Sequence, residues 1–290
     1  YSQKVKASKE FQTFQFDHSF VLNSLKSSME GYVFHNQPLD TDDLLEQTVK
    51  LFNSCKTSLE LFDMLHNMRA YDDSTYAHSL NVALICRRIG KWLKVDAATL
   101  DTLTLCGLLH DIGKLKIPDE ILNKPDKYTD EEFDLVKRHT KFGYELLKTL
   151  NIDPHIKKAA LLHHERCDGS GYPLKATQKD LDDFSMVVAI ADVYDAMTAA
   201  RSYRAPLCPF QVIERFEQEG LQKYKPKFIL TFLQHIASTY QNNRVLLSNG
   251  QSANIVMLNQ QHLARPIVQL NDNSCIDLST RLDLHIQSIL

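Results

Sequence analysis

The apolar residues of this chain recur with helical spacing over most of its length. From Thr41 onward they lie three and four positions apart, as in the face formed by Leu45, Val49 and Phe52, and this period is typical of amphipathic helices. N-cap residues or prolines precede several of these segments. After helices that carry Leu59–Met68 and His78, the pattern predicts an all-α bundle with helices over residues 97–111, 130–150, 154–164, 180–200, 209–217 and 226–240.

The two ends of the chain follow other patterns. Residues 1–50 carry weak signals, because Phe11–Phe16 alternates as in a strand whereas Phe20–Met29 has helical spacing; we expect a cap or linker there. Residues 242–290 change to a period of two. Turn signals separate four runs that predict a small β appendage of two hairpins without catalytic residues: Val245–Leu247, Ile255–Leu258, Ile267–Leu270 and Ile276–Leu278.

A histidine and an aspartate, His110 and Asp111, directly follow the apolar segment Leu103–Leu109. A buried carboxylate is costly unless a cation, hydrogen-bond donors or a metal compensates its charge. Adjacent side chains on a helix diverge by about a quarter turn. His110 can therefore hold one ion while the two oxygens of Asp111 bridge to a second.

Four other places put imidazoles or carboxylates into apolar helical pattern. His78 is in register with Val82, Ile85 and Ile89, which predicts that it points inward. The others are His139 within the helix predicted for 130–150, the pair His163 and His164 at the end of an apolar run, and Asp192 at the end of another.

These residues, in this order, resemble the metal ligands of the HD superfamily of metal-dependent phosphohydrolases. The stretch from His163 to Pro173 resembles the signature of the HD-GYP subgroup, whose members hydrolyse the bacterial second messenger cyclic di-GMP. The resemblance covers roughly residues 51–240 and implies that 51–241 is a catalytic domain with a binuclear site. It implies one ion held by His78, His110, Asp111 and Asp192, and another held by Asp111, His139, His163 and His164.

Imidazole and carboxylate ligands without a thiolate suit iron, manganese or zinc, and the resemblance favours iron, then manganese. Two such ions turn a shared water into a metal-bridged hydroxide and neutralise a phosphodiester, so we expect cyclic di-GMP to be cleaved to pGpG, to GMP or to both. Asp111 is the expected catalytic residue together with Lys114. Lys114 follows His110 by four positions, and on a continuing helix it would project from the same face toward a phosphate.

Further substrate contacts are implied by the loop and by the segment after Asp192. Tyr172 is expected to stack on a base, and Glu165 to orient the neighbouring histidines or the loop. The substrate-binding set is Lys114, Gly171, Tyr172, Pro173, Asp195, Arg201 and Arg204.

One position departs from the pattern of family members that hold three metals. These carry a glutamate four residues before the first histidine, where this chain has Ser74. We therefore expect two ions, and the departure leaves open whether hydrolysis continues to GMP. Cys167, beside the histidine pair, is expected to serve packing rather than redox sensing.

Composition narrows the remaining choices. The chain has 290 residues, 43% hydrophobic and 24% charged, with a net charge of −3, which gives no reason to expect binding to a nucleic acid polymer or an anionic membrane. Six scattered cysteines read as reduced thiols. No apolar stretch is long enough to insert into a membrane, so a cytoplasmic protein is expected.

A di-iron oxygenase is disfavoured because Lys114, Arg201 and Arg204 suit a phosphorylated substrate. Two alternatives to cyclic di-GMP hydrolysis stay open. One is hydrolysis of another cyclic dinucleotide, such as cyclic GMP-AMP. The other is a sensor or interaction module that binds a nucleotide, or a diguanylate cyclase domain through the loop, without hydrolysis. A homodimer is compatible with any of these functions.

Overall fold

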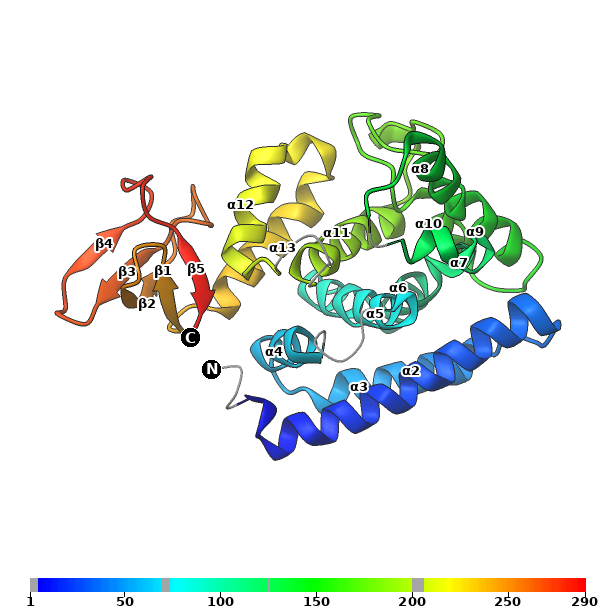
Figure 1. Cartoon of the computed structure of the whole chain (residues 1–290), viewed down its shortest axis with the longest axis horizontal. Helices are drawn as coiled ribbons and strands as arrows, with labels where there is room; N and C mark the ends of the chain where they lie inside the picture. The colour runs from blue at the N-terminus through cyan, green and yellow to red at the C-terminus, as the bar shows by residue number, and fades with distance from the viewer. Residues whose placement is uncertain (1–4, 69–73, 125, 200–205) are drawn as a thin grey trace.

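The helical part of the molecule is built around two antiparallel helices, α5 (Thr75–Trp92) and α6 (Ala97–Leu109). The structure is a computed structural model that describes residues 5–68, 74–124, 126–199 and 206–290. Side chains at the caps start both helices: Ser74 accepts from the Ala77 N–H and Asp96 from the Thr99 N–H. Almost all of α5 between Ala77 and Gly90 is buried, because other helices surround it (Figure 1).

Three N-terminal helices flank this pair: α2 (Lys9–His35), α3 (Thr41–Ser54) and α4 (Ser58–Met68). Figure 1 shows α2 and α3 running along one side of the molecule. The strand-like reading of Phe11–Phe16 was wrong. Phe11 and Phe14 are buried three positions apart and Phe16 is exposed, which is the spacing of a helix face, and the Ser8 side chain caps the helix start.

The metal-ligand helices predicted from the sequence are shorter than expected. The helix expected over 97–111 ends at Leu109. It is followed by a 3₁₀ turn, η1 (Ile112–Lys116), and by the short α7 (Asp119–Leu122). The 130–150 helix is two helices, α8 (Asp130–Lys137) and α9 (His139–Leu147). Next come α10 (Pro154–Leu162), the 3₁₀ turn η2 (Gln178–Asp180) and α11 (Asp183–Thr198). These breaks place histidines at helix ends.

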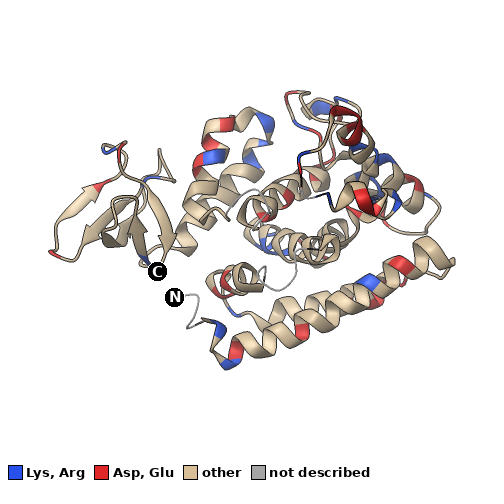
Figure 2. Ribbon diagram, viewed as in Figure 1, with Lys and Arg blue, Asp and Glu red and all other residues tan. Residues whose placement is uncertain are grey.

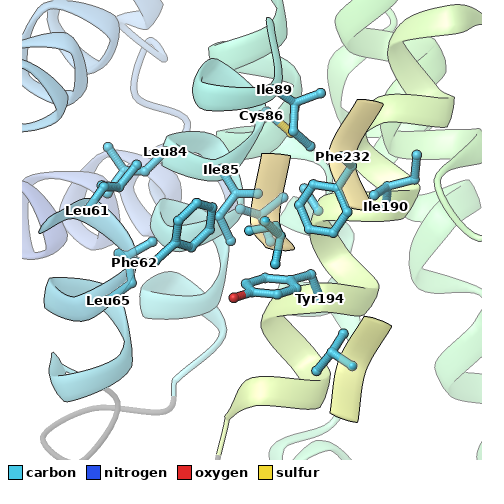
Figure 3. Packing of buried hydrophobic residues seen from close by; sticks show 14 of the residues in the cluster. Leu61, Phe62, Leu65, Leu84, Ile85, Cys86, Ile89, Ile190, Tyr194 and Phe232 are labelled. Carbon is cyan, nitrogen blue, oxygen red and sulfur yellow. The ribbon is translucent and has the colours of Figure 1, made fainter. Parts of the chain in front are cut away.

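An aromatic core fixes α11 against its neighbours (Figure 3). The Tyr194 ring lies edge-on to Phe62 of α4 at 5.5 Å and to Phe232 of α13 (Pro226–Thr239) at 5.2 Å between ring centroids. Such contacts stabilise by about 1 kcal/mol each beyond the area they bury. Tyr194 lies between Asp192 and Asp195 in sequence, so this packing also fixes the direction of both carboxylates.

The C-terminal residues form one five-stranded antiparallel sheet, not two separate hairpins. It follows α12 (Pro209–Glu219), the 3₁₀ turn η3 (Leu221–Lys223) and α13. The strand order is β4-β3-β2-β1-β5, with Val245 of β1 opposite Ala253 of β2 and Ile289 of β5. The strands are β1 (Arg244–Leu247), β2 (Ser252–Met257), β3 (Ile267–Leu270), β4 (Cys275–Asp277) and β5 (Ile286–Ile289). The sequence pattern missed β5, which has only two apolar residues.

Charges of both signs are interspersed on the helices, and the sheet carries few (Figure 2). This distribution agrees with the small net charge of −3. Within the described ranges, none of the helices combines the length and apolarity that crossing a bilayer requires.

Candidate metal centre

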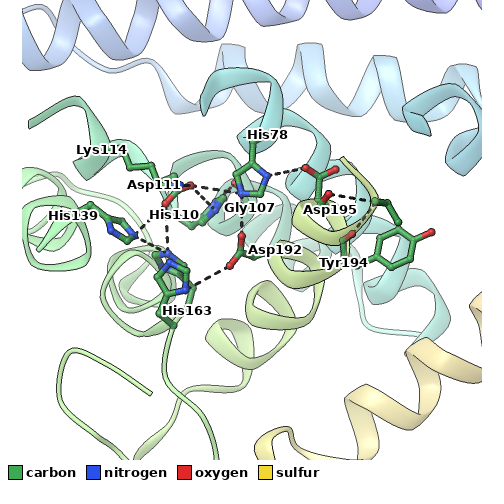
Figure 4. A network of polar contacts seen from close by, with 12 residues as sticks. His78, Gly107, His110, Asp111, Lys114, His139, His163, Asp192, Tyr194 and Asp195 are labelled. Carbon is green, nitrogen blue, oxygen red and sulfur yellow. Dashed lines mark hydrogen bonds and ion pairs between the residues drawn. The ribbon is translucent and has the colours of Figure 1, made fainter. Parts of the chain in front are cut away.

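Asp111 lies at the centre of a buried cluster of imidazoles (Figure 4). It follows the last turn of α6 and is 1% exposed. Its Oδ1 lies 3.3 Å from His139 Nε2 and 3.6 Å from His163 Nε2. Its Oδ2 lies 3.3 Å from His110 Nε2 and 3.6 Å from His78 Nε2. Each carboxylate oxygen therefore faces a different pair of histidines.

The orientation of three of these imidazoles is set by backbone carbonyls. The Nδ1–H groups of His110, His139 and His163 donate to the carbonyls of Gly107, Val136 and Ala159 at 2.7, 2.7 and 2.9 Å. A carbonyl only accepts, so Nδ1 carries the proton and the Nε2 lone pair points into the cluster. This is the arrangement in which histidines bind metals.

The inward-pointing atoms fit a cation. His139 Nε2 and His163 Nε2 lie 3.2 Å apart, and two lone pairs that face each other at this distance repel unless a positive charge lies between them. His110 Nε2 is buried without a hydrogen-bond partner among the described residues. Ligand atoms about 2.1 Å from a shared ion are separated by about 3.0–3.4 Å, which is close to the separations observed here.

Two ligand groups share Asp111. One contains Asp111, His139, His163 and His164, and the other contains His78, His110 and Asp111. Asp192 of α11 lies beside the second group, with Oδ1 3.0 Å from His78 Nε2, and its Oδ2 is 3.7 Å from His164 Nδ1. The structure thus brings together all seven residues that the sequence suggested as metal ligands, with Asp192 between His78 of one group and His164 of the other.

Burial and charge put Asp111, His139, His163 and His164 in the protonation state that metal binding requires. Burial acts to raise the pKa of Asp111, but the Lys114 ammonium opposes it and holds that pKa well below its usual range. Burial lowers the pKa of His139 to about 3, although Asp111 opposes this. Burial also lowers the pKa of His163 and of His164. The carboxylate is thus ionised and these imidazoles are neutral at pH 7.

His78 differs from the other histidines because a carboxylate, not a carbonyl, holds its Nδ1. Asp195 Oδ2 lies 2.8 Å from this nitrogen, and Asp195 is 2% exposed. Burial acts to lower the pKa of His78, but hydrogen bonds to Asp192 and Asp195 outweigh it and raise that pKa to about 9. Asp195 was expected to contact substrate; the structure places it behind His78, where it orients the imidazole.

Lys114 reaches the cluster by a different route from the one expected. The helix does not continue past Leu109, so Lys114 does not share a helical face with His110. It lies on η1, with Nζ 2.6 Å from Asp111 Oδ2 and its side chain 21% exposed. Gly113 allows this turn to approach α9 closely, since a Cβ there would lie 1.9 Å from the His139 carbonyl oxygen.

The loop after His164 is held from inside by Glu165. This buried carboxylate accepts from the N–H groups of Leu174 at 2.6 Å and Ala176 at 3.1 Å, which confirms its predicted role in orienting the loop. Gly171 is required by close packing, because a Cβ there would lie 2.4 Å from the Glu165 Cα. The Tyr172 ring stacks on His164 with 4.7 Å between centroids, so one of its faces is already covered.

The remaining predicted positions have simpler outcomes. Arg201 and Arg204 lie outside the described residues. Ser74 caps α5. Cys167 packs in the core with its Sγ 3.4 Å from Met186 Sδ, and burial raises the pKa of its thiol, so the packing role is confirmed. The sequence could not reveal the backbone carbonyls that orient the histidines, because any residue type supplies one.

Comparison with known proteins relates this chain to cyclic dinucleotide enzymes. It is 34% identical over 183 residues to a 3'3'-cGAMP-specific phosphodiesterase of Vibrio cholerae, covering 62% of this chain and 35% of that protein. It is 35% identical over 178 residues to a cyclic di-GMP phosphodiesterase of Thermotoga maritima, covering 60% of this chain and 48% of that protein. The chain thus spans half or less of the length of either relative.

The fold and the family agree with the resemblance drawn from the sequence. The HDG"Y"P protein Bd1817 of Bdellovibrio bacteriovorus has a similar fold, with a TM-score of 0.62 at 19% identity, covering 77% of this chain and 71% of that one. The HD domain family matches residues 43–228, which include every residue of the His/Asp cluster. The chain therefore belongs to the HD domain family.

Proposed function

We propose that this chain is a metal-dependent phosphodiesterase that hydrolyses a cyclic dinucleotide, with cyclic di-GMP as the first candidate substrate. The observation that carries the proposal is the division of the cluster by Asp111, each of whose oxygens faces two imidazole nitrogens at 3.3–3.6 Å. One carboxylate placed in this way suits two ions side by side, and a pair of ions is the arrangement used for displacement at phosphorus.

The residues have separate tasks in this proposal. His78, His110, Asp111 and Asp192 would hold one divalent ion, and Asp111, His139, His163 and His164 the other. We propose iron first and manganese second, because nitrogen and oxygen ligands without thiolate suit both. The ions, when bound, supply a nucleophile at neutral pH and neutralise the phosphodiester. Lys114, whose side chain is 21% exposed, would pair with a phosphate oxygen.

Cyclic GMP-AMP is the second candidate substrate. The observation that favours it is the 34% identity to a Vibrio cholerae phosphodiesterase specific for that dinucleotide. Both dinucleotides present the same phosphodiester to the cluster, so discrimination between them depends on contacts to the bases. Docking of a diguanylate cyclase domain on the loop, homodimer formation and a cytoplasmic location stay predictions.

Turnover and metal content measured on one preparation test the proposal. We expect protein loaded with Fe(II) or Mn(II) to convert cyclic di-GMP to pGpG or GMP, resolved by chromatography. Asp111→Ala should abolish turnover, and Asp283→Ala, which removes an exposed carboxylate paired with Arg281 far along the chain, should not. Binding of cyclic di-GMP without any product, with both ions bound, would instead identify a sensor.

A further inference from the structure

The metal cluster is open to solvent at only some of its members. The side chains of His164 and Lys114 are 20% and 21% exposed, whereas His110, His139 and His163 are at most 1% exposed. The side chains of His78 and Asp192 are 9% and 10% exposed, so the most open approach for a phosphate lies beside His164 and Lys114. The groups around His164 then decide what can be attached to that phosphate.

Two aromatic rings follow one another outward from His164. Tyr172 stacks on His164 with 4.7 Å between ring centroids. Phe133 of α8 packs against Tyr172 with 6.5 Å between centroids and an interplanar angle of 78°. Phe133 is 46% exposed, although α8 packs on α9 and its neighbour Val136 is buried. This phenylalanine is an accessible aromatic surface two rings away from a candidate metal ligand.

We propose that Phe133 is the platform on which a purine base of the substrate stacks. This inference rests on the proposed function, since it requires a nucleotide whose phosphate lies at the cluster. In a nucleotide the ribose separates the base from the phosphate. When the phosphate lies at the cluster, we therefore expect the base to lie beyond Tyr172. Tyr172 already has one face covered by His164, and Phe133 offers the larger open surface. Guanine and adenine both stack on an aromatic ring, because every base has a π-face.

A lysine side chain lies over the ring of this platform and can make way for a base. Lys137 Nζ lies 5.0 Å from the centroid of the Phe133 ring. Its ion pair with Asp134, at 2.5 Å, is solvent-screened because the Asp134 side chain is 72% exposed. The ammonium can therefore leave the ring face when a base stacks there.

Two small ligands separate base stacking from phosphate binding. GMP carries a purine base and ribose 5-phosphate does not, so calorimetry with Mn(II)-loaded protein measures the contribution of the base directly. We expect the protein to bind GMP at least about tenfold more tightly than ribose 5-phosphate, the size of one base–aromatic stack. Phe133→Ala should bring this ratio close to one and leave unchanged the affinity for ribose 5-phosphate, the bound metal and the melting temperature.

Two variants serve as controls. Phe133→Trp keeps an aromatic platform and should retain the preference for GMP. Phe20→Ala removes an exposed phenylalanine from α2, where it is 61% exposed, and should change nothing.

The inference is overturned if the wild type binds both ligands equally, if Phe133→Ala keeps the preference for GMP, or if it weakens both ligands together. Turnover of cyclic di-GMP by the wild type is recorded on the same preparation. If the wild type turns over cyclic di-GMP and Phe133→Ala keeps the wild-type ratio of GMP to ribose 5-phosphate affinity, only the platform is refuted. If the wild type shows no turnover and binds neither ligand, the proposed function is refuted as well.

Discussion

At the scale of single residues, Asp111 couples the two halves of the cluster. Asp111→Asn keeps the size of the side chain but removes its charge and replaces one oxygen with an amide NH₂ group, which donates hydrogen bonds. We expect the variant to retain at most one of two bound metal ions and to lose at least about 100-fold in turnover. Elemental analysis beside a turnover assay measures both quantities. Two ions retained at full occupancy would contradict the bridging role.

Lys114 tests whether the exposed edge of the cluster receives the substrate. Lys114→Gln removes the ammonium that lies 2.6 Å from Asp111 Oδ2 but none of the proposed ligands. We expect turnover to fall by about 100-fold, as when one charge-stabilising donor is removed from an active site. The metal content should stay constant. A loss of metal equal to the loss of turnover would show that Lys114 acts through Asp111 instead.

The sequence was informative about individual ligand candidates and uninformative about the groups that orient them. His78, His110 and Asp192 could be recognised because polar side chains within apolar helical pattern need partners. The carbonyl of Gly107 that orients His110 could not be recognised, and neither could the position of Asp195 behind His78. Both depend on how helices pack, which residue type alone does not determine.

At the scale of elements, the loop after His164 depends on one buried carboxylate. Glu165→Gln leaves a single carbonyl oxygen as acceptor and places an amide N–H₂ against the N–H of Leu174 or Ala176. We expect the loop to open locally at a free-energy cost lower by about 1–3 kcal/mol. Hydrogen exchange of residues 172–177 should accelerate, and exchange within α5 should not. Unchanged protection of the loop would show that other contacts hold it.

Helix existence was predicted better than helix ends. The helices expected over 154–164, 209–217 and 226–240 are found within a few residues of those limits. The single helices expected over 97–111 and 130–150 are each interrupted near a candidate ligand, at His110 and at Arg138. Both breaks lie beside ligand candidates, and Gly113 approaches α9 closely after the first of them; neither feature alters apolar periodicity.

At the scale of the whole molecule, metal binding and folding should be linked. The helices α5, α6, α9, α10 and α11, with their flanking turns, each bring a ligand candidate to the same place, so an ion that binds only the folded chain stabilises all of them together. At a free metal concentration about 1,000 times Kd, we expect the free energy of unfolding to rise by about 4 kcal/mol. Denaturation with EDTA and after addition of Mn(II) measures this change, and identical curves would contradict the linkage.

The sheet and the N-terminal helices show what the sequence pattern leaves open. Arg265 pairs with Glu214 of α12 at 2.6 Å, and the Leu263 N–H donates to Glu217, so the C-terminal sheet is docked on the helical part. Period-two alternation identified four of its strands and missed β5, because pairing with β1, and not local composition, defines that strand. The boundaries at residues 50 and 241 stay predictions.

Anomalous diffraction from crystals grown with Mn(II) is the most direct test of a paired-ion site. Two peaks are predicted, both against the Asp111 carboxylate, one also beside His78 and His110 and the other beside His139, His163 and His164. A single peak, or no peak with the imidazoles turned away from one another, would contradict the account.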